Sequence, residues 1–275
     1  PLASVFSDGF ADAGEAGAHS FPITQLHEPP YGSTRTAPRQ VVWAYRVWNG
    51  AAYDLKVGNL SLTSNATKLA FSVQPSNAAA TVAISPAIKV QVQDAGGNLV
   101  TGATNSITLA IGTNPAGGTL SGTLTVAAVG GEATFSNISI DKAGTGYTLT
   151  ASATGLTFAT SNAFNITVGV AAQLAFTTQP GNGTGGSNLA TQPVVTVQDA
   201  GGNTVTTATN SITLAIGTNP SGGTLTVTTN PLAATAGVAA FAGVKIDKAG
   251  TGYTLTASAT GLTGATSASF NITVG

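Results

Sequence analysis

The sequence predicts an all-β fold in which two tandem β-sandwiches follow an N-terminal arm, and three observations lead to this prediction. Residues 140–153 return letter for letter as residues 246–259, so most of the chain consists of two copies of one module. Within each copy, apolar and polar residues alternate in short runs, which is the period of a half-buried strand. Clusters of Gly, Asn and Pro separate these runs, and helical periodicity is absent.

Residues 1–60 are expected to form the arm, which contains a β-hairpin. Gly and Pro interrupt the first forty residues, where residues 20–24 have the composition of a short edge strand. Residues 41–48 alternate clearly, and residues 51–57 supply the return strand after an Asn-Gly pair, which is a strong signal for a hairpin turn. The polar, uncharged stretch that follows leads through a linker at residues 61–65 into the first module.

The predicted hairpin carries many aromatic residues for its size. A lone hairpin is only marginally stable in water, so we expect these rings to pack against other structural proteins of a larger assembly, copies of the same chain included. The alternatives are a small private core and a domain whose remainder lies elsewhere. The candidates for an assembly anchor are Trp43, Tyr45, Trp48 and Tyr53.

The two modules are expected at residues 66–169 and 170–275. Corresponding residues lie 105 positions apart, as Ile107 and Ile212 do, and 106 apart after a one-residue insertion. Alternation predicts which side chains of the first module face inward. These are Leu69, Phe71, Ile88, Val90, Val92, Ile107, Leu109, Ile111, Ala133, Phe135, Ile138, Ile140, Tyr147, Leu149, Ala151, Ala153, Phe164, Ile166 and Val168.

About seven alternating runs in roughly 100 residues, with turn signals between them, are typical of an immunoglobulin-like (Ig-like) sandwich. The run Asp-Lys-Ala-Gly-Thr-Gly-Tyr, which ends at Tyr147 and again at Tyr253, fits the corner at which a Tyr opens the penultimate strand. In such a corner the Tyr hydroxyl bonds back to the backbone a few residues upstream. Tyr147 and Tyr253 are therefore predicted to have a structural role.

Four segments of the first module recur in the second and carry a resemblance to a known family. They are residues 92–100, 118–120, 131–135 and 142–151, with counterparts at 197–205, 223–225, 237–241 and 248–257. In these segments the modules resemble bacterial Ig-like domains of group 1, the invasin and intimin type. The resemblance implies a stalk segment of a bacterial adhesin, although Ig-like domains of several groups also decorate phage heads, tails and fibres. The adhesive tip and the membrane barrel of the invasin type are not in this sequence, and residues 1–60 match no family.

Composition and charge exclude several classes of function. Charged residues make up 7% of the chain and the net charge is -1, which argues against a nucleic-acid partner and against an anionic membrane surface. No apolar run reaches the length of about 18 residues that a membrane span needs. The chain has no Cys, and the modules have no His that could activate a Ser or Thr. We expect no catalytic, cofactor-binding or metal site, and no enzyme activity.

Three arrangements have the atoms for chemistry, but each has a simpler explanation. Asp94, Asn98 and Asp141 carry oxygens that suit Ca²⁺, yet Asp and Asn are ordinary turn residues and the charge is low for a tight site. Lys142 beside Asp141 has the groups of an isopeptide bond, yet a solvated corner is expected for both. Acid-base groups in the arm lie in Gly- and Pro-rich loops that do not pre-organise a site. They are Asp8, Asp12, Glu15, His19, His27 and Glu28.

These observations favour a non-enzymatic structural protein that displays two Ig-like domains on the exterior of a large assembly. Our first expectation is a phage virion decoration or fibre protein, located at the virion surface and anchored by its N-terminal region. Pro1 fits trimming of an initiator Met better than a signal-peptidase cut, although a fragment boundary explains it too. The alternative is a secreted bacterial surface adhesin stalk or extracellular filament subunit. Many copies would add weak contacts with host-surface glycans or proteins.

Overall fold

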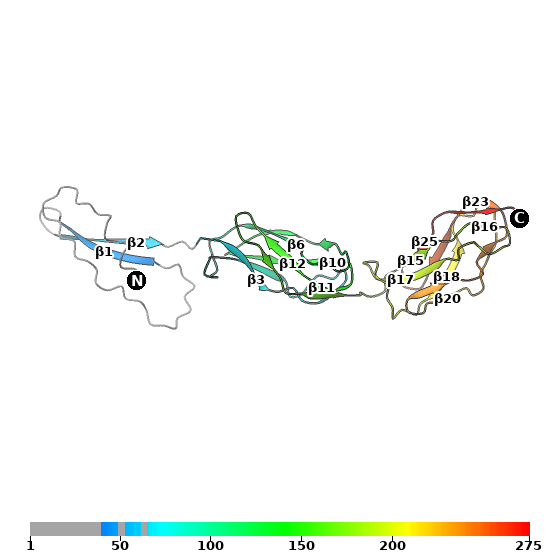
Figure 1. Cartoon of the computed structure of the whole chain (residues 1–275), viewed down its shortest axis with the longest axis horizontal. Helices are drawn as coiled ribbons and strands as arrows, with labels where there is room; N and C mark the ends of the chain where they lie inside the picture. The colour runs from blue at the N-terminus through cyan, green and yellow to red at the C-terminus, as the bar shows by residue number, and fades with distance from the viewer. Residues whose placement is uncertain (1–39, 49–52, 62–64) are drawn as a thin grey trace. The chain divides into compact units, whose positions relative to one another are not determined.

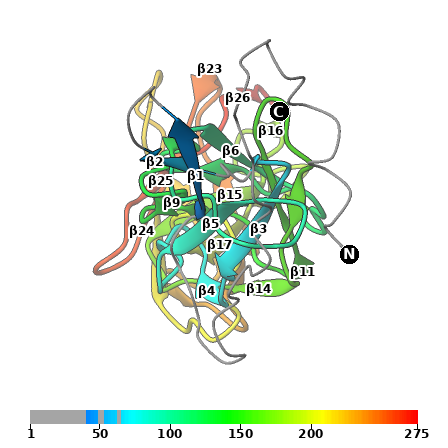
Figure 2. The same ribbon diagram turned by 90° about the vertical axis from the view of Figure 1, so that its left-hand side faces the viewer.

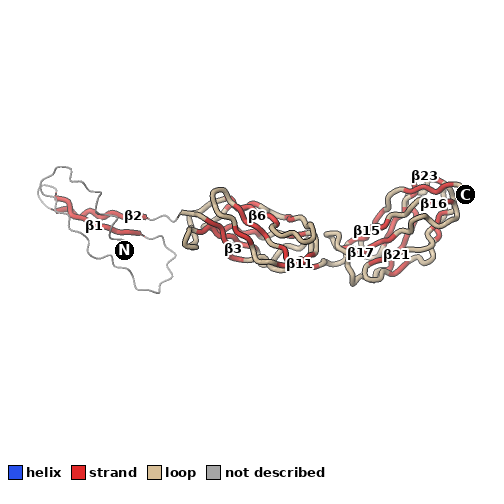
Figure 3. The backbone as a smooth tube through the Cα atoms, in the orientation of Figure 1, coloured by secondary structure: helices blue, strands red, loops and turns tan. Residues whose placement is uncertain are grey.

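The computed structural model describes residues 40–48, 53–61 and 65–275, and only the backbone in the first two of these ranges. The described residues form strands, turns and loops without a helix, as Figure 3 shows by its red and tan segments. The expected edge strand at residues 20–24 lies outside them. The prediction of an all-β chain with tandem Ig-like sandwiches is confirmed.

The N-terminal unit contains a two-stranded antiparallel hairpin of β1 (Gln40–Trp48) and β2 (Tyr53–Ser61). Trp48 pairs with Tyr53, and Gln40 pairs with Ser61. The return strand was therefore predicted too early and too short. It starts two residues later and runs to Ser61, because all nine residues of β1 have a partner. This hairpin belongs to a unit separate from residues 66–275.

The four anchor candidates all lie in this hairpin. Trp43 and Tyr45 belong to β1, and Trp48 faces Tyr53 across the end of the pair. Their side chains lie outside the described part of the chain, so their role as an anchor stays a prediction.

Repeat 1, residues 66–169, is a sandwich of two layers in which neighbouring strands are antiparallel except for β4 and β14 (Figure 1). One layer is the sheet β3-β5-β9, whose neighbouring strands β3 and β5 can also be followed in Figure 2. The other consists of the sheets β13-β12-β6-β8 and β11-β14-β4. The ladder β10-β7 extends the first layer, because the N–H of Ile84, ahead of β5, donates to the carbonyl of Ile138, just ahead of β10. The strands are β3 (Lys68–Val73), β4 (Ala78–Ala79), β5 (Ile88–Gln93), β6 (Ser106–Ile111), β7 (Leu120–Ser121), β8 (Thr125–Ala127), β9 (Glu132–Phe135), β10 (Ser139–Ile140), β11 (Gly144–Tyr147), β12 (Leu149–Ser152), β13 (Ala159–Thr160) and β14 (Phe164–Thr167).

Repeat 2, residues 170–275, has the same topology. Its sheets are β15-β17-β21, β20-β18-β24-β25 and β16-β26-β23, with the ladder β19-β22. In both repeats one short strand pairs in parallel with the last strand, β4 with β14 and β16 with β26. The strands are β15 (Gln173–Thr178), β16 (Gly183–Thr184), β17 (Val194–Gln198), β18 (Ser211–Ile216), β19 (Leu225–Thr226), β20 (Leu232–Ala233), β21 (Val238–Ala240), β22 (Lys245–Ile246), β23 (Gly250–Tyr253), β24 (Leu255–Ser258), β25 (Ala265–Thr266) and β26 (Phe270–Thr273).

Each repeat has its own buried core between its layers. The side chains of β5 alternate as predicted, with Ile88, Val90 and Val92 fully buried. Most of the expected inward set is buried or, as with Phe71, packs half-buried against the core. Val168 is the exception, because 43% of its surface is exposed. The prediction was wrong there because β14 ends at Thr167 and the chain then leaves the sheet.

Candidate functional site at the joint between the repeats

The site begins with a rigid corner segment in each repeat, residues 141–144 and 247–250. The hydroxyl of Tyr147 donates a hydrogen bond to the carbonyl of Lys142 at 2.9 Å, and Tyr253 does the same to Lys248 at 3.0 Å. Both Tyr side chains are fully buried. Burial, and then the charge of Asp141, raises the pKa of Tyr147, so the phenol stays a neutral donor.

The first residue of each corner segment is held by its own repeat. Oδ1 of Asp141 accepts a hydrogen bond from the backbone N–H of Thr119 at 2.6 Å, and Asp247 accepts one from Thr224 at 2.6 Å. Each carboxylate thus ties the corner segment to the turn that precedes the ladder strands β7 and β19. Each corner segment is therefore held by two hydrogen bonds within its own repeat, one from the Tyr hydroxyl and one to the Asp carboxylate.

The corner segment of repeat 1 contacts a Gly-rich turn of repeat 2, residues 199–203. Nζ of Lys142 donates to the carbonyl of Gly201 at 2.7 Å. The N–H of Ala143 donates to Oδ1 of Asn203 at 3.0 Å, and Nδ2 of Asn203 donates to the carbonyl of Asp141 at 2.8 Å. We call these contacts, together with the contact of Gly169 described next, the joint. Gly169 lies in the connection between the two repeats, which is called the linker from here on.

A buried carboxylate ties the linker to the same turn. Oδ2 of Asp199 accepts the N–H of Gly169 at 2.8 Å, while Oδ1 accepts the N–H groups of Gly201 and Asn203, each at 2.9 Å. Only 1% of Asp199 is exposed. Burial alone would raise its pKa, but the hydrogen bonds from Asn203 and Gly169 outweigh burial and lower the pKa below its ordinary value. The joint therefore contains a charged acceptor at neutral pH.

Gly201 is required at the joint because the two backbones nearly touch. A Cβ at this position would overlap the carbonyl oxygen of Asp141 in repeat 1. The backbone at Gly201 is not in the left-handed region, so the requirement comes from this close approach rather than from backbone conformation.

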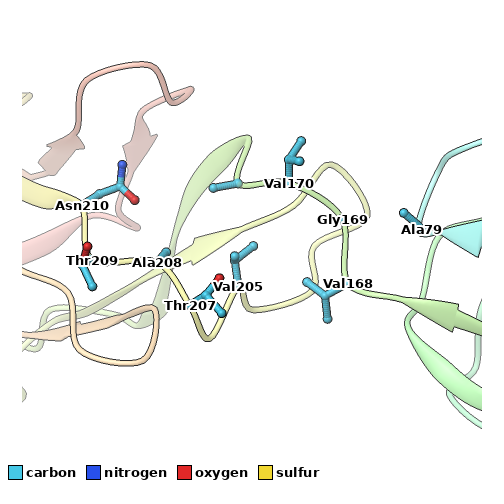
Figure 4. A pocket seen from close by; sticks show the side chains of 10 residues that line it. Ala79, Val168, Gly169, Val170, Val205, Thr207, Ala208, Thr209 and Asn210 are labelled. Carbon is cyan, nitrogen blue, oxygen red and sulfur yellow. The ribbon is translucent and has the colours of Figure 1, made fainter.

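A shallow groove of about 550 Å³ lies beside the linker (Figure 4). Val170 is 86% exposed there, and small apolar and Thr side chains make up most of the lining. Its lining contains no Asp, Glu, His, Cys, Lys or Arg side chain. Its lining residues are Ala79, Val168, Gly169, Val170, Ala171, Val205, Thr207, Ala208, Thr209 and Asn210.

The carboxylates that were candidates for Ca²⁺ ligands form hydrogen bonds with nearby backbone and side-chain groups. Asp94 is bonded by Asn98 within its own turn, whereas Asp141 is bonded by Thr119. Among the described residues no group of three or more His, Cys, Asp or Glu lies together. The expectation that Lys142 is simply solvated was wrong, because its ammonium is half-buried in the joint. The acid-base set of the arm lies outside the described residues.

The joint was not predicted from the sequence, although both segments that form it are repeated in the chain. The Gly-rich turn reads Asp-Ala-Gly-Gly-Asn in both copies, and the corner segment reads Asp-Lys-Ala-Gly in both. We interpreted the first as a turn and the second as part of the Tyr corner. The signal that could have found the joint is the strict identity of these exposed segments, which alternation and core packing do not explain.

Comparisons with family models and with curated proteins give no match for this chain. Among solved structures, domains 4–9 of surface layer protein SbsC are 19% identical, with coverage of 86% of this chain and 35% of that chain and a TM-score of 0.33. Titin domains z1z2 in complex with telethonin are 13% identical, with coverage of 78% and 98% and a TM-score of 0.21. Mouse clustered PcdhgC3 EC1-3 is 15% identical, with coverage of 86% and 77% and a TM-score of 0.27.

Likenesses of this size carry no argument on function, and the fold assignment rests on the strand pairing of the chain itself. The chain spans about a third of the length of the surface-layer fragment that it matches. In the part of the chain that the structure describes, no helix is long and apolar enough to cross a membrane.

Proposed function

We propose that the chain is a non-catalytic structural protein that displays its two Ig-like repeats on the exterior of a large assembly. The observation that carries the proposal is the joint. The corner segment of repeat 1 and the Gly-rich turn of repeat 2 form three hydrogen bonds with each other, and Asp199 binds the linker at Gly169. These contacts restrict the motion of one repeat relative to the other. A pair of repeats joined in this way suits a spacer that holds its far end away from its base.

The chemistry of the repeats supports the same role. Residues 65–275 offer an open groove without acid-base groups, and the chain carries few charges for recognising nucleic acid or anionic lipid. The low charge and the Thr-, Ser- and Gly-rich surface fit weak contacts that gain strength through many copies.

Our proposal for the assembly is a phage virion, with the hairpin of residues 40–61 as the anchor and copies of the chain among the partners. The aromatic load of the hairpin motivates the anchor. The second candidate is a stalk or filament on a bacterial surface, and the likeness of residues 142–151 and 248–257 to the invasin and intimin type favours it.

Immunogold electron microscopy of the source material, with antibody against residues 66–275, tests the proposal. Gold on phage-like particles supports a virion protein, and gold on cell envelopes or filaments replaces the virion by the bacterial surface. Gold confined to the cell interior, away from any assembly, would contradict both locations and the display function. Antibody absorbed with the purified chain is the control for specific labelling.

A further inference from the structure

The joint is formed by a Gly-rich turn and a corner segment, and each repeat of the chain contains one copy of both. The Gly-rich turn at residues 199–203 occurs again, with the same five letters, at residues 94–98. The corner segment at residues 141–144 occurs again, with the same four letters, at residues 247–250. The joint uses the corner segment of repeat 1 and the turn of repeat 2, which leaves the turn of repeat 1 and the corner segment of repeat 2 outside it.

The backbone of the turn in repeat 1 is held like that of its counterpart, although in repeat 1 Nζ of Lys68 also donates to the carbonyl of Ala95 at 3.5 Å. The N–H of Asn98 donates to Oδ1 of Asp94 at 2.9 Å, and the N–H of Gly97 donates to the carbonyl of Asp94 at 3.0 Å. The equivalent distances in repeat 2 are 2.9 and 3.1 Å. Within residues 65–275, however, Gly96 and Asn98 are exposed, whereas their counterparts in the joint are half-buried.

The corner segment of repeat 2 is also preformed. Tyr253 and Thr224 hold it by the same two bonds that hold the corner segment of repeat 1. Asp247 and Lys248 are exposed among residues 65–275, while the equivalent pair in repeat 1 is half-buried against the Gly-rich turn.

Gly96 adds an independent observation. Its backbone is not left-handed, and a Cβ there would meet no backbone atom within 4 Å, but only the side chains of Asn98 at 3.0 Å and Asp94 at 3.3 Å, which are hydrogen-bonded to each other. Within repeat 1, alanine at this position would therefore require these two side chains to shift slightly, without displacing any backbone. The equivalent residue of repeat 2, Gly201, does need to be glycine, because the carbonyl of Asp141 in the corner segment of repeat 1 lies against it. Glycine at residue 96 thus leaves room for the backbone of a docked corner segment.

We propose that the exposed halves bind each other between two copies of this chain, so that residues 247–250 of one copy dock on residues 94–98 of the next. By analogy with the joint, Nζ of Lys248 donates to the carbonyl of Gly96. The N–H of Ala249 donates to Oδ1 of Asn98, and Nδ2 of Asn98 donates to the carbonyl of Asp247. The contact is head to tail and repeats from copy to copy, as heterologous interfaces do.

The contact between copies is weaker than the joint for a physical reason. The fourth bond of the joint comes from the linker residue Gly169, which also holds the two partners at high effective concentration. Separate copies lack this tether, so the contact becomes important where copies are crowded on an assembly. The inference deepens the proposed function by naming a partner, but it rests on the geometry of the joint. Its failure in solution would leave the immunogold result untouched.

The test is sedimentation equilibrium of the full chain at concentrations up to about 1 mM, the range of effective concentration that a short tether provides. The wild type should show mass that grows with concentration. Gly96→Ala blocks the turn and Lys248→Met removes the ammonium donor. Each should weaken self-association about tenfold or more, the effect of losing one interface hydrogen bond or creating one overlap. Gly102→Ala is the matched control, because a Cβ there meets nothing within 4 Å.

Mixing the two variants makes the test specific. A Gly96→Ala chain keeps a competent corner segment, and a Lys248→Met chain keeps a competent turn, so the mixture should form dimers and stop there. Unchanged melting of both variants separates this result from misfolding. A wild type that stays monomeric throughout, variants that associate like the wild type, or a mixture without dimers would each overturn the proposal.

Discussion

Asp94 and Asp199 occupy the same place in two copies of one turn, but their carboxylates hold different things together. Asp94 binds the backbone and side chain of Asn98, and Asp199 binds Asn203 in the same way. Asp199 also accepts the N–H of Gly169 in the linker. The Asp of this turn therefore stabilises only a local turn in repeat 1, whereas in repeat 2 it also connects the two sandwiches. The difference arises because Gly169 of the linker lies against the turn of repeat 2.

The Tyr corner gives a prediction at the scale of one atom. Tyr147→Phe removes the hydroxyl that donates to the carbonyl of Lys142 and leaves that carbonyl without its partner. Repeat 1 should lose about 1–3 kcal/mol of its free energy of unfolding, measured by chemical denaturation. Tyr253→Phe is the matched variant and should weaken repeat 2 alone. An unchanged free energy of unfolding of repeat 1 in Tyr147→Phe would show that this hydrogen bond does not stabilise the repeat.

Among the strands, alternation predicted the long ones and missed the short ones. The period of two is legible in β5 and β6, because six residues give three inward side chains. Strands β4, β7 and β10 have two residues each, so no period can be seen in them. Pairings with distant residues create these strands, and a single sequence does not show such pairings.

Side-chain amides of the N-terminal segment of each repeat also bind backbone N–H groups near its last strand. Oδ1 of Asn77 accepts the N–H of Asn165 at 2.7 Å, and Oε1 of Gln74 accepts the N–H of Asn162 at 2.9 Å. The second copy repeats both bonds, at 2.8 Å each. The sequence analysis made no prediction for these amides, because their partners lie almost ninety positions away along the chain.

The outer face of the sheet β3-β5-β9 carries a polar cluster that repeat 2 lacks. The carboxylate of Glu132 accepts from Lys89 at 2.8 Å, from Ser72 at 2.8 Å and from Gln91 at 3.2 Å. Val194 and Val238 stand in repeat 2 where repeat 1 has Lys89 and Glu132. The bond from Lys89, and then that from Ser72, lowers the pKa of Glu132 against the opposing effect of burial.

This cluster leads to a prediction on stability and pH. Glu132→Gln should cost repeat 1 about 1 kcal/mol or less at pH 7, because the side chains of Lys89 and Glu132 are 40% and 23% exposed and water screens their attraction. A lowered pKa means that the carboxylate stabilises the fold above its unfolded pKa of about 4.3 and loses that effect as the pH falls. The difference in stability between wild type and variant should therefore shrink as the pH falls below about 4.3 in denaturant titrations. A difference that keeps its full size as the carboxylate is protonated would contradict the assigned role.

At the scale of the whole molecule, the sequence predicted two sandwiches but not what connects them. The core of each repeat follows from local periodicity, whereas the joint links residues about sixty positions apart through turns. Lys142 illustrates the difference. Its neighbours in the sequence suggested a solvated corner, and only the fold brings Gly201 to its ammonium group. The anchor candidates stay predictions, since their side chains lie outside the described residues.

The joint itself can be tested by adding one methyl group. Gly201→Ala should push the Gly-rich turn away from the carbonyl of Asp141 and cost the joint roughly 1–3 kcal/mol, the range for disrupted buried hydrogen bonds. Gly96→Ala is the matched control, because its Cβ meets the same local side chains, at 3.0 Å for Asn98, without a partner backbone in repeat 1. Both variants should keep the unfolding behaviour of their cores.

Distances between spin labels would measure the effect. The chain has no Cys, so single cysteines at the exposed Val129 in repeat 1 and Val274 in repeat 2 give one label in each repeat. In dilute samples the wild type and Gly96→Ala should show one narrow distance distribution, and Gly201→Ala should show a clearly broader one. Equal widths in all three would mean that the linker, rather than the contact between turn and corner segment, sets how the repeats are held. The spacer proposal would then lose its main support.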